Sequence, residues 1–128
     1  MLELIMVILI IGILAVAVMG RLPGSVISLH AQARQLAQEI RHTRALAMNR
    51  SGSHTIRNSG SASYEVTNGV EILSSGTLDS VSFQSGFSIL FDGRGSPDSF
   101  EDIAITLNSG GESLTLVVVG DTGAVRIP

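Results

Sequence analysis

The chain has 128 residues and contains no cysteine and no lysine, so that all eight of its basic residues are arginine. The missing cysteines exclude a disulfide framework and a thiolate metal site. Charge is divided among three zones, because residues 1–20 carry a formal charge of −1, residues 21–50 carry +4 and residues 51–128 carry −6. This asymmetry predicts an apolar anchor, a basic neck and an acidic head.

The first zone is apolar apart from Glu3. An apolar run of this length predicts a membrane-spanning helix, which we assign to residues 1–22. A carboxylate is costly inside a membrane, so Glu3 is a candidate functional residue. The simpler explanation is that a negative charge in the first turn of a helix is favoured by about 0.3–1 kcal/mol. The residues alone leave both explanations open.

A cleaved secretory signal peptide is the main alternative for this segment. The small residues of Ala15-Val-Ala17 fit the pattern before a cleavage site. A signal peptide, however, begins with basic residues, and this segment carries Glu3 instead. We therefore favour an anchor that is retained.

A second helix is predicted for residues 23–50, the neck. Pro23 lacks a backbone donor, so we expect a kink or local unwinding there. Asn49 and Gly52 are typical of a helix end near Arg50. The apolar residues of this segment recur at helical spacing and share one face, which is expected to cover the sheet of the head; they are Leu29, Ala33, Leu36, Ile40 and Ala47.

Residues 51–128 change to short alternating apolar runs separated by Gly, Asn, Asp and Ser, which predicts about six to eight antiparallel strands. Tyr64–Thr67 and Val70–Ile72 flank Asn68-Gly69, a pair that predicts a two-residue hairpin turn. The remaining runs are centred on Val81 and Phe83, on Phe87, Ile89 and Phe91, on Ile103, Ile105 and Leu107, on Leu114, Leu116 and Val118, and on Val125 and Ile127. The expected fold is therefore α+β, with a long N-terminal helix packed on a small antiparallel sheet.

The neck arginines are candidate anion-binding residues. Arg34 and Arg41 are seven positions apart and share a helix face, while Arg44 lies to one side. Such a stripe could bind the phosphates of DNA or of lipid headgroups. The alternatives are a solvated face or pairing with acidic parts of other subunits. Aromatic residues that would stack on bases are missing nearby and the head is acidic, so nucleic acid binding is the less favoured hypothesis.

No metal or catalytic site is expected. The acidic cluster at Asp92, Asp98, Glu101 and Asp102 offers oxygen ligands for Ca²⁺, but its spacing fits no EF-hand loop and a polar turn is favoured. The three histidines, His30, His42 and His54, do not form a metal-ligand set and are expected to be solvated. The motifs of serine hydrolases, zinc peptidases and P-loop enzymes are missing from the sequence. We therefore predict a protein that is not an enzyme and has no cofactor.

The segment from Met1 to Val18 resembles the N-terminal segment of type IV pilins and type II secretion pseudopilins. That family has a glutamate near the start of the mature helix, an internal glycine and a later proline, which Glu3, Gly12 and Pro23 match. Residues 33–50 resemble the neck of its GspH/FimT-like branch. The segments 91–95, 108–111 and 123–127 resemble the end of that branch's head, in the manner of a minor subunit of a mannose-sensitive haemagglutinin-type pilus.

The resemblance implies a minor pseudopilin or minor pilin, a structural subunit of a type II secretion pseudopilus or a type IV pilus. Assembly would use the apolar helix, with Glu3, Gly12 and Pro23 as assembly residues and Glu3 paired with the terminal amine of a neighbour. The implied partners are other pilin or pseudopilin subunits, the inner membrane, and a prepilin peptidase for the unprocessed form. We expect Met1 to lie about two residues inside the mature sequence, so processing and N-methylation are not visible in it.

The resemblance also implies a single pass through the bacterial inner membrane with the head in the periplasm. Charge bias alone predicts the opposite orientation, because arginines follow the apolar segment and none precedes it. Two further hypotheses stay open. One is a minor pilin that binds DNA or a surface through its neck arginines or head, and the other is a membrane-tethered periplasmic domain without a filament role.

Overall fold

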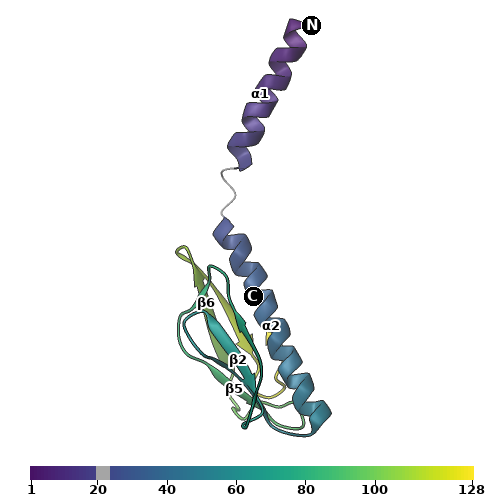
Figure 1. Cartoon of the computed structure of the whole chain (residues 1–128), viewed down its shortest axis with the longest axis vertical. Coiled ribbons are helices and arrows are strands. Elements are labelled where there is room, and N and C mark those ends of the chain that lie inside the picture. The colour runs from purple at the N-terminus through teal and green to yellow at the C-terminus, as the bar shows by residue number, and fades with distance from the viewer. Residues whose placement is uncertain (20–23) are drawn as a thin grey trace.

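The computed structural model describes residues 1–19 and 24–128. In this part of the chain two helices precede eight strands; they are α1 (Leu2–Met19), α2 (Gly24–Arg50), β1 (His54–Asn58), β2 (Ser63–Thr67), β3 (Ile72–Thr77), β4 (Ser82–Phe83), β5 (Ser88–Phe91), β6 (Ile103–Ser109), β7 (Glu112–Val118) and β8 (Val125–Arg126). In Figure 1, α2 lies along the strands and α1 extends away from them. The predicted α+β fold is confirmed.

The strands form two four-stranded antiparallel sheets. The first has the order β3-β2-β1-β5 and the second has the order β4-β6-β7-β8. Strand β4 lies between β3 and β5 in the sequence but pairs with β6, so the chain leaves the first sheet and returns to it. The β6–β7 pair is the longest regular hairpin and runs in register from Ile103↔Val118 to Ser109↔Glu112.

The apolar stripe of α2 is buried as predicted. Leu36, Ile40 and Ala47 have no exposed surface, and α2 packs against strands of both sheets, including β1, β6 and β7. Thr43 lies on the same side and is also fully buried; its hydroxyl donates to the carbonyl oxygen of Glu39 at 2.8 Å, which satisfies its hydrogen-bonding need inside the core. One apolar core therefore joins the neck helix to both sheets.

The predicted hairpin at Asn68 is present, but its turn is longer than expected. Strands β2 and β3 pair up to Thr67↔Ile72, which leaves the four-residue loop 68–71 in place of a two-residue turn. The Asn68 side-chain oxygen accepts hydrogen bonds from the backbone N–H groups of Val70 and Glu71, at 3.0 and 2.8 Å. These bonds hold the wider loop, so the prediction that Val70 begins the second strand was wrong.

Strand β1 was missing from the sequence prediction, and His54, its first residue, is not solvated as expected. His54 is only 3% exposed, with Nδ1 3.0 Å from the carbonyl oxygen of Gly52. Its Nε2 has no hydrogen-bond partner among the described residues. His30 and His42 are exposed on α2, as expected.

Among the described residues no helix is long and apolar enough to cross a membrane. The predicted anchor, residues 1–22, and the predicted kink at Pro23 both include residues outside the described ranges. They remain predictions.

Candidate functional site

Residues 2–17 of α1 are apolar apart from Glu3, and all of them are exposed. In Figure 1 the helix extends away from the strands. Leu4, Ile5, Met6 and Val7 together span one helical turn, and they are 65, 63, 62 and 51% exposed. A helix that buries one face against its own domain would show one low value among four successive residues. Residues 2–17 of this helix have no buried face, so only another molecule can remove their surface from water.

Glu3 and Gly12, two of the predicted assembly residues, both lie on this bare helix. Glu3 is exposed in the first turn, where the helix dipole favours a negative charge. No atom lies within 4 Å of the position that a Cβ at Gly12 would occupy, so the glycine leaves open space beside the helix. Pro23, the third predicted residue, lies outside the described residues.

The three predicted anion-binding arginines do not converge on one site. Arg41 Nη2 donates to the carbonyl oxygen of Val125 at 3.3 Å, and Arg44 Nε donates to that of Gly95 at 2.9 Å. Arg34 is exposed on the outer side of α2. Two of the three guanidinium groups therefore contact the head, although Arg41, like Arg34, is an exposed residue.

Arg44 is part of a close junction that the sequence did not predict. Gly95, in the loop after β5, and Gly123, in the turn before β8, are both buried and have φ values of +80° and +73°. A Cβ at Gly123 would lie 2.8 Å from the carbonyl oxygen of Gly95 and 3.3 Å from Cδ of Arg44. We call these three residues the helix–loop junction. The only signal in the sequence was the pair of glycines within the segments that resemble the family's head.

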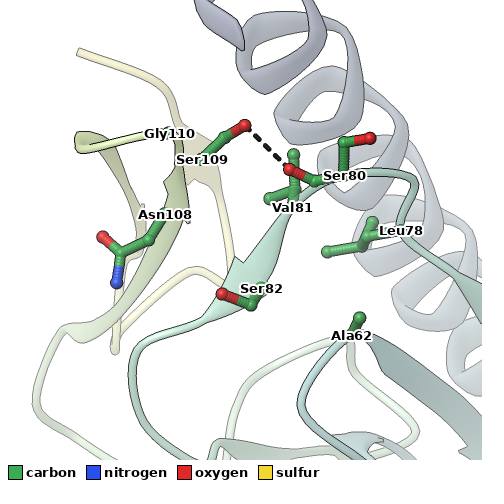
Figure 2. Close-up of a pocket in the computed structure, with 8 residues that line it drawn as sticks. All are labelled: Ala62, Leu78, Ser80, Val81, Ser82, Asn108, Ser109 and Gly110. Atoms are coloured by element: carbon green, nitrogen blue, oxygen red, sulfur yellow. Dashed lines mark hydrogen bonds between the residues drawn. The ribbon is translucent and has the colours of Figure 1, made fainter.

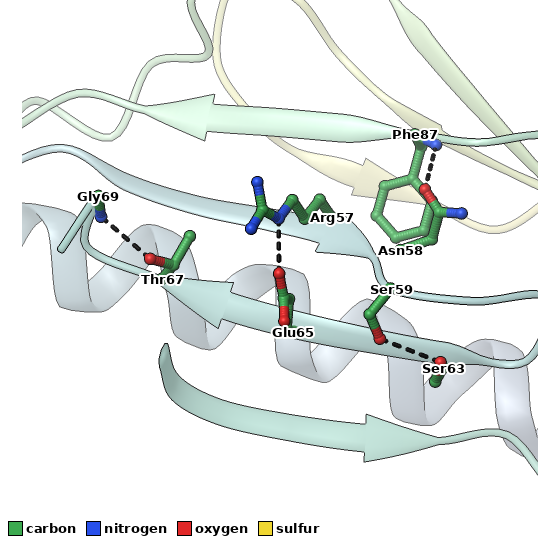
Figure 3. A network of polar contacts seen from close by, with 8 residues as sticks. All are labelled: Arg57, Asn58, Ser59, Ser63, Glu65, Thr67, Gly69 and Phe87. Carbon is green, nitrogen blue, oxygen red and sulfur yellow. Dashed lines mark hydrogen bonds and ion pairs between the residues drawn. The ribbon is translucent and has the colours of Figure 1, made fainter. Parts of the chain in front are cut away.

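The outer face of the first sheet carries polar pairs (Figure 3). Arg57 on β1 pairs with Glu65 on β2, with 2.6 Å between Nε and Oε1. Asn58 accepts a hydrogen bond through its side-chain oxygen from the backbone N–H of Phe87 at 2.9 Å. These contacts join neighbouring strands, and none of them places a nucleophile beside a base.

Two carboxylates of the predicted acidic cluster, those of Asp92 and Asp102, accept hydrogen bonds from backbone N–H groups. Asp92 Oδ1 accepts from the N–H groups of Arg94 and Ser96, at 2.9 and 3.0 Å, and these bonds lower the pKa of Asp92 below its usual value. Asp102 Oδ1 accepts from Gly120 N at 3.0 Å. Within residues 1–19 and 24–128, no three His, Asp or Glu side chains are placed to hold a metal ion.

A shallow hollow of about 370 Å³ lies between the loop that follows β3 and the end of β6 (Figure 2). Ser109 Oγ donates across its edge to the carbonyl oxygen of Ser80 at 2.7 Å. The residues that line the hollow are serines, one asparagine, one glycine and three aliphatic residues, so none can act as an acid or a base at neutral pH. The geometry of the hollow offers shape and neutral hydrogen bonds without catalytic chemistry.

Comparison with known families identifies the neck and the head. The family model described as type II transport protein GspH matches residues 32–123, which is most of the chain. The chain belongs to the GspH family. This is a family of structural pilin or pseudopilin subunits.

Two solved structures show the same fold. Both are crystal structures of the type IV minor pilin FimU of Pseudomonas aeruginosa, at 11% sequence identity. They give TM-scores of 0.67 and 0.66, each over 78% of this chain and over 87 and 92% of the FimU chains. No curated protein sequence matches the chain. At this identity the likeness establishes the pilin-like fold and leaves the function to be argued from the family and from this surface.

Proposed function

We propose that this GspH-family protein is a minor pseudopilin or minor pilin that assembles into a filament through α1. The observation that carries the proposal is the apolar surface of α1, which is exposed on every side while the neck and head share a complete core. A helix with this surface fits a lipid bilayer, together with the residues that follow it, and fits a bundle of similar helices equally well. Exchange between these two surroundings is what extraction from the membrane into a filament requires.

In the proposed filament, Glu3 sets the axial position of neighbouring subunits. A single carboxylate among packed apolar helices is costly unless it meets a cation, so only one register satisfies it. The open space beside Gly12 supports close approach of another helix at that level. Pro23 is proposed as the third assembly residue. The head is proposed to lie in the periplasm, with a prepilin peptidase acting on the unprocessed form.

The test compares Glu3→Gln with the unchanged chain in cells that make the other filament subunits. We expect both to reach the membrane equally, because one neutral side chain in an apolar helix does not reduce insertion. Co-purification of Glu3→Gln with filament subunits should fall at least tenfold. An exposed head substitution, Ser113→Gln, serves as the matched control and should co-purify normally. Equal recovery of the Glu3→Gln chain would contradict the role of Glu3.

A tether without a filament role is distinguished by the same experiment. A tether needs the apolar surface of α1 but no other pilin subunit. If the unchanged chain itself fails to co-purify with pilin subunits from cells that assemble filaments, the proposal of a filament subunit fails.

A further inference from the structure

Among the described residues the two sheets end in four edge strands, of which β4, β5 and β8 are short or covered by the protein's own chain. Strands β4 and β8 have two residues each, and Phe83 N on β4 donates to the carbonyl oxygen of Ser61 at 2.7 Å. The free side of β5 is covered by the loop that follows it, because Asp98 N donates to the carbonyl oxygen of Leu90 at 2.9 Å. Strand β3 is the outermost strand of the first sheet, and no strand of residues 1–19 or 24–128 pairs with its other side (Figure 3). An open edge of this kind can accept a further strand.

The register of the β2–β3 pair shows which backbone groups of β3 are free. Leu78 N donates to the carbonyl oxygen of Ala62 at 2.7 Å, so these two residues form a hydrogen-bonded pair. Hydrogen-bonded and non-hydrogen-bonded pairs alternate along an antiparallel ladder. Ser75 and Thr77 therefore belong to non-hydrogen-bonded pairs, and their N–H and C=O groups point away from β2. An added strand would find a donor and an acceptor at each of these two residues.

The β3 edge has little of the protection that exposed edges usually carry. Natural edges are protected by charged residues, proline or a bulge. Residues 72–78 contain no charged residue and no proline. The bulge of this strand is confined to its start, near Leu73, so that residues 74–77 pair regularly with β2. Ile72 is also 61% exposed at the start of the strand, which leaves apolar surface for a partner to cover.

The surroundings of the β3 edge are acidic. The segment from residue 58 to residue 93 contains four acidic residues and no basic residue. Glu71 precedes β3 and Asp79 follows it, and both are exposed. Glu65, on the neighbouring strand, is already paired with Arg57. The charges left free at the two ends of the edge are therefore negative.

A further carboxylate lies beside this edge on α2. The Tyr64 hydroxyl lies against the position that a Cβ at Gly76 would occupy, so the phenol reaches the edge strand. Burial raises the pKa of the Tyr64 phenol, and the nearby Glu39 carboxylate raises it further. Glu39 is partly buried and has no ion-pair partner within the described part of the chain. Arg41 lies about 200° further round the helix and donates to Val125, so it points to the other side of α2.

We propose that the β3 edge binds an extended segment of a different protein, which adds a strand to the first sheet and directs a basic side chain toward Glu39. The backbone of this segment pairs with Ser75 and Thr77. The side chain that it places beside Gly76 points to the α2 side of the sheet, because Gly76 is opposite the buried Tyr64. A cation at that position meets the unpaired carboxylate of Glu39.

The same charges argue against a second copy of β3 as the occupant. Strand β3, Ile72–Thr77, carries no basic side chain, so two copies paired edge to edge would leave both Glu39 carboxylates without a cation. A different protein with a basic residue in its strand satisfies the backbone and the carboxylate together. One edge takes one strand, so this contact joins two molecules and does not propagate. The inference goes beyond the proposed function, because the contact belongs to the head and does not need α1.

The test uses the full-length protein in detergent and a fluorescent probe peptide. The probe is a heptapeptide that alternates threonine and valine around one central lysine, and a second probe has glutamate in place of lysine. We expect saturable binding of the lysine probe by fluorescence anisotropy, and at least tenfold weaker binding of the glutamate probe. Equal affinity for the two probes, or no saturable binding of the lysine probe, overturns the inference.

Ser75→Pro tests the backbone contact. Proline removes an N–H that points away from β2, so the β2–β3 hydrogen bonds remain and the head should stay folded. Binding of the lysine probe should weaken at least tenfold. Ser75→Val keeps the N–H and is the matched control, which should bind the probe as the unchanged chain does. Equal binding by Ser75→Pro and Ser75→Val overturns the inference.

Glu39→Gln tests the charge contact without altering the strand. The preference for the lysine probe over the glutamate probe should fall at least fivefold in this variant. Glu112→Gln, at an exposed site at the start of β7, is the control and should keep the full preference. A preference that does not respond to Glu39→Gln overturns the inference.

Two further measurements separate the alternatives. Sedimentation of the protein without peptide tests the second copy as occupant, since a dimer that Ser75→Pro abolishes would assign the edge to self-pairing and overturn the inference. Glu3→Gln should bind the lysine probe normally, because Glu3 lies on α1. If the probe does not bind while filament subunits still co-purify with the unchanged chain, this inference fails and the proposed function stands.

Discussion

The two helices of this protein place their apolar side chains in opposite environments. Helix α1 exposes apolar side chains in every direction, whereas α2 hides one apolar stripe under two sheets and turns polar residues to solvent. A side chain in α2 therefore contributes to the stability of its own molecule, and a side chain in α1 contributes only when another molecule is present. The comparison separates residues that stabilise the head from residues that are left available for contact with other molecules.

The largest expected effect is a difference between matched leucines of the two helices. Leu36→Ala removes a fully buried side chain of α2 and should lower the free energy of unfolding of the head by about 2–5 kcal/mol. Leu9→Ala on α1 removes a side chain that is 60% exposed and should leave head stability unchanged. Chemical denaturation in detergent can be followed through Tyr64, the single tyrosine, which is buried in the head. Equal losses of unfolding free energy for both variants would show that the two helices do not differ in their contribution to head stability.

The next effect concerns the helix–loop junction. Gly123→Ala combines a φ of +73° with a Cβ placed 2.8 Å from a backbone oxygen, so it should cost more than the roughly 1–3 kcal/mol of backbone strain alone. Gly111→Ala is the matched control, because Gly111 has a φ of +85° and open space around it. The difference between the two unfolding free energies isolates the close approach to Gly95. A Gly123→Ala variant no less stable than Gly111→Ala would show that the junction adapts.

A smaller effect distinguishes two arginines on the same helix. Arg44→Ala loses the bond to the Gly95 carbonyl oxygen and should destabilise the head by about 0.5–1.5 kcal/mol. Arg34→Ala, on the exposed side of α2, should change stability by less than about 0.5 kcal/mol. Both are read by the same denaturation experiment. If Arg34→Ala were the more damaging, the division of α2 into a folding face and an outward face would be wrong.

The smallest expected effect is the contribution of Asp92 to pH dependence. Its pKa is lowered by backbone hydrogen bonds from Ser96 and Arg94, so the folded state favours the ionised carboxylate. The resulting stability is complete above the ordinary carboxyl pKa of 3.8 and is lost as the pH falls from there through the lowered value. Denaturation midpoints between neutral pH and this acidic range should fall less steeply for Asp92→Asn than for the unchanged chain. Identical slopes would exclude this contribution.

Much of this organisation follows from local patterns in the sequence. The apolar stripe of α2 and most strands could be predicted because their periodicity is set by burial against one neighbouring layer. Strand β1 could not be predicted, because Ile56 is its only strongly apolar residue. The other buried residue of the strand is His54, and histidine occurs both in protein interiors and on surfaces. The turn at Asn68 was misjudged because side-chain hydrogen bonds to Val70 and Glu71 stabilise a loop that the Asn-Gly pair does not encode.

The part of the candidate site that lies on α1 could be predicted from the sequence, whereas the contacts of the neck arginines could not. Glu3 and Gly12 are recognisable within an apolar run, although nothing in the structure tests their roles. The partners of Arg41 and Arg44 are 84 and 51 positions away along the chain, so no local pattern indicates that these guanidinium groups face the head.

The placement of α2 along both sheets has a mechanical consequence. Tension applied to the helix along its axis would load the interface with the sheets in shear, so contacts from Leu29 to Ala47 would resist together instead of separating one after another. The hydrogen bond from Arg44 to Gly95 lies near the C-terminal end of α2 and holds the last turns of this helix against the head. The head is therefore expected to stay attached to α2 when force is applied along the axis of the helix.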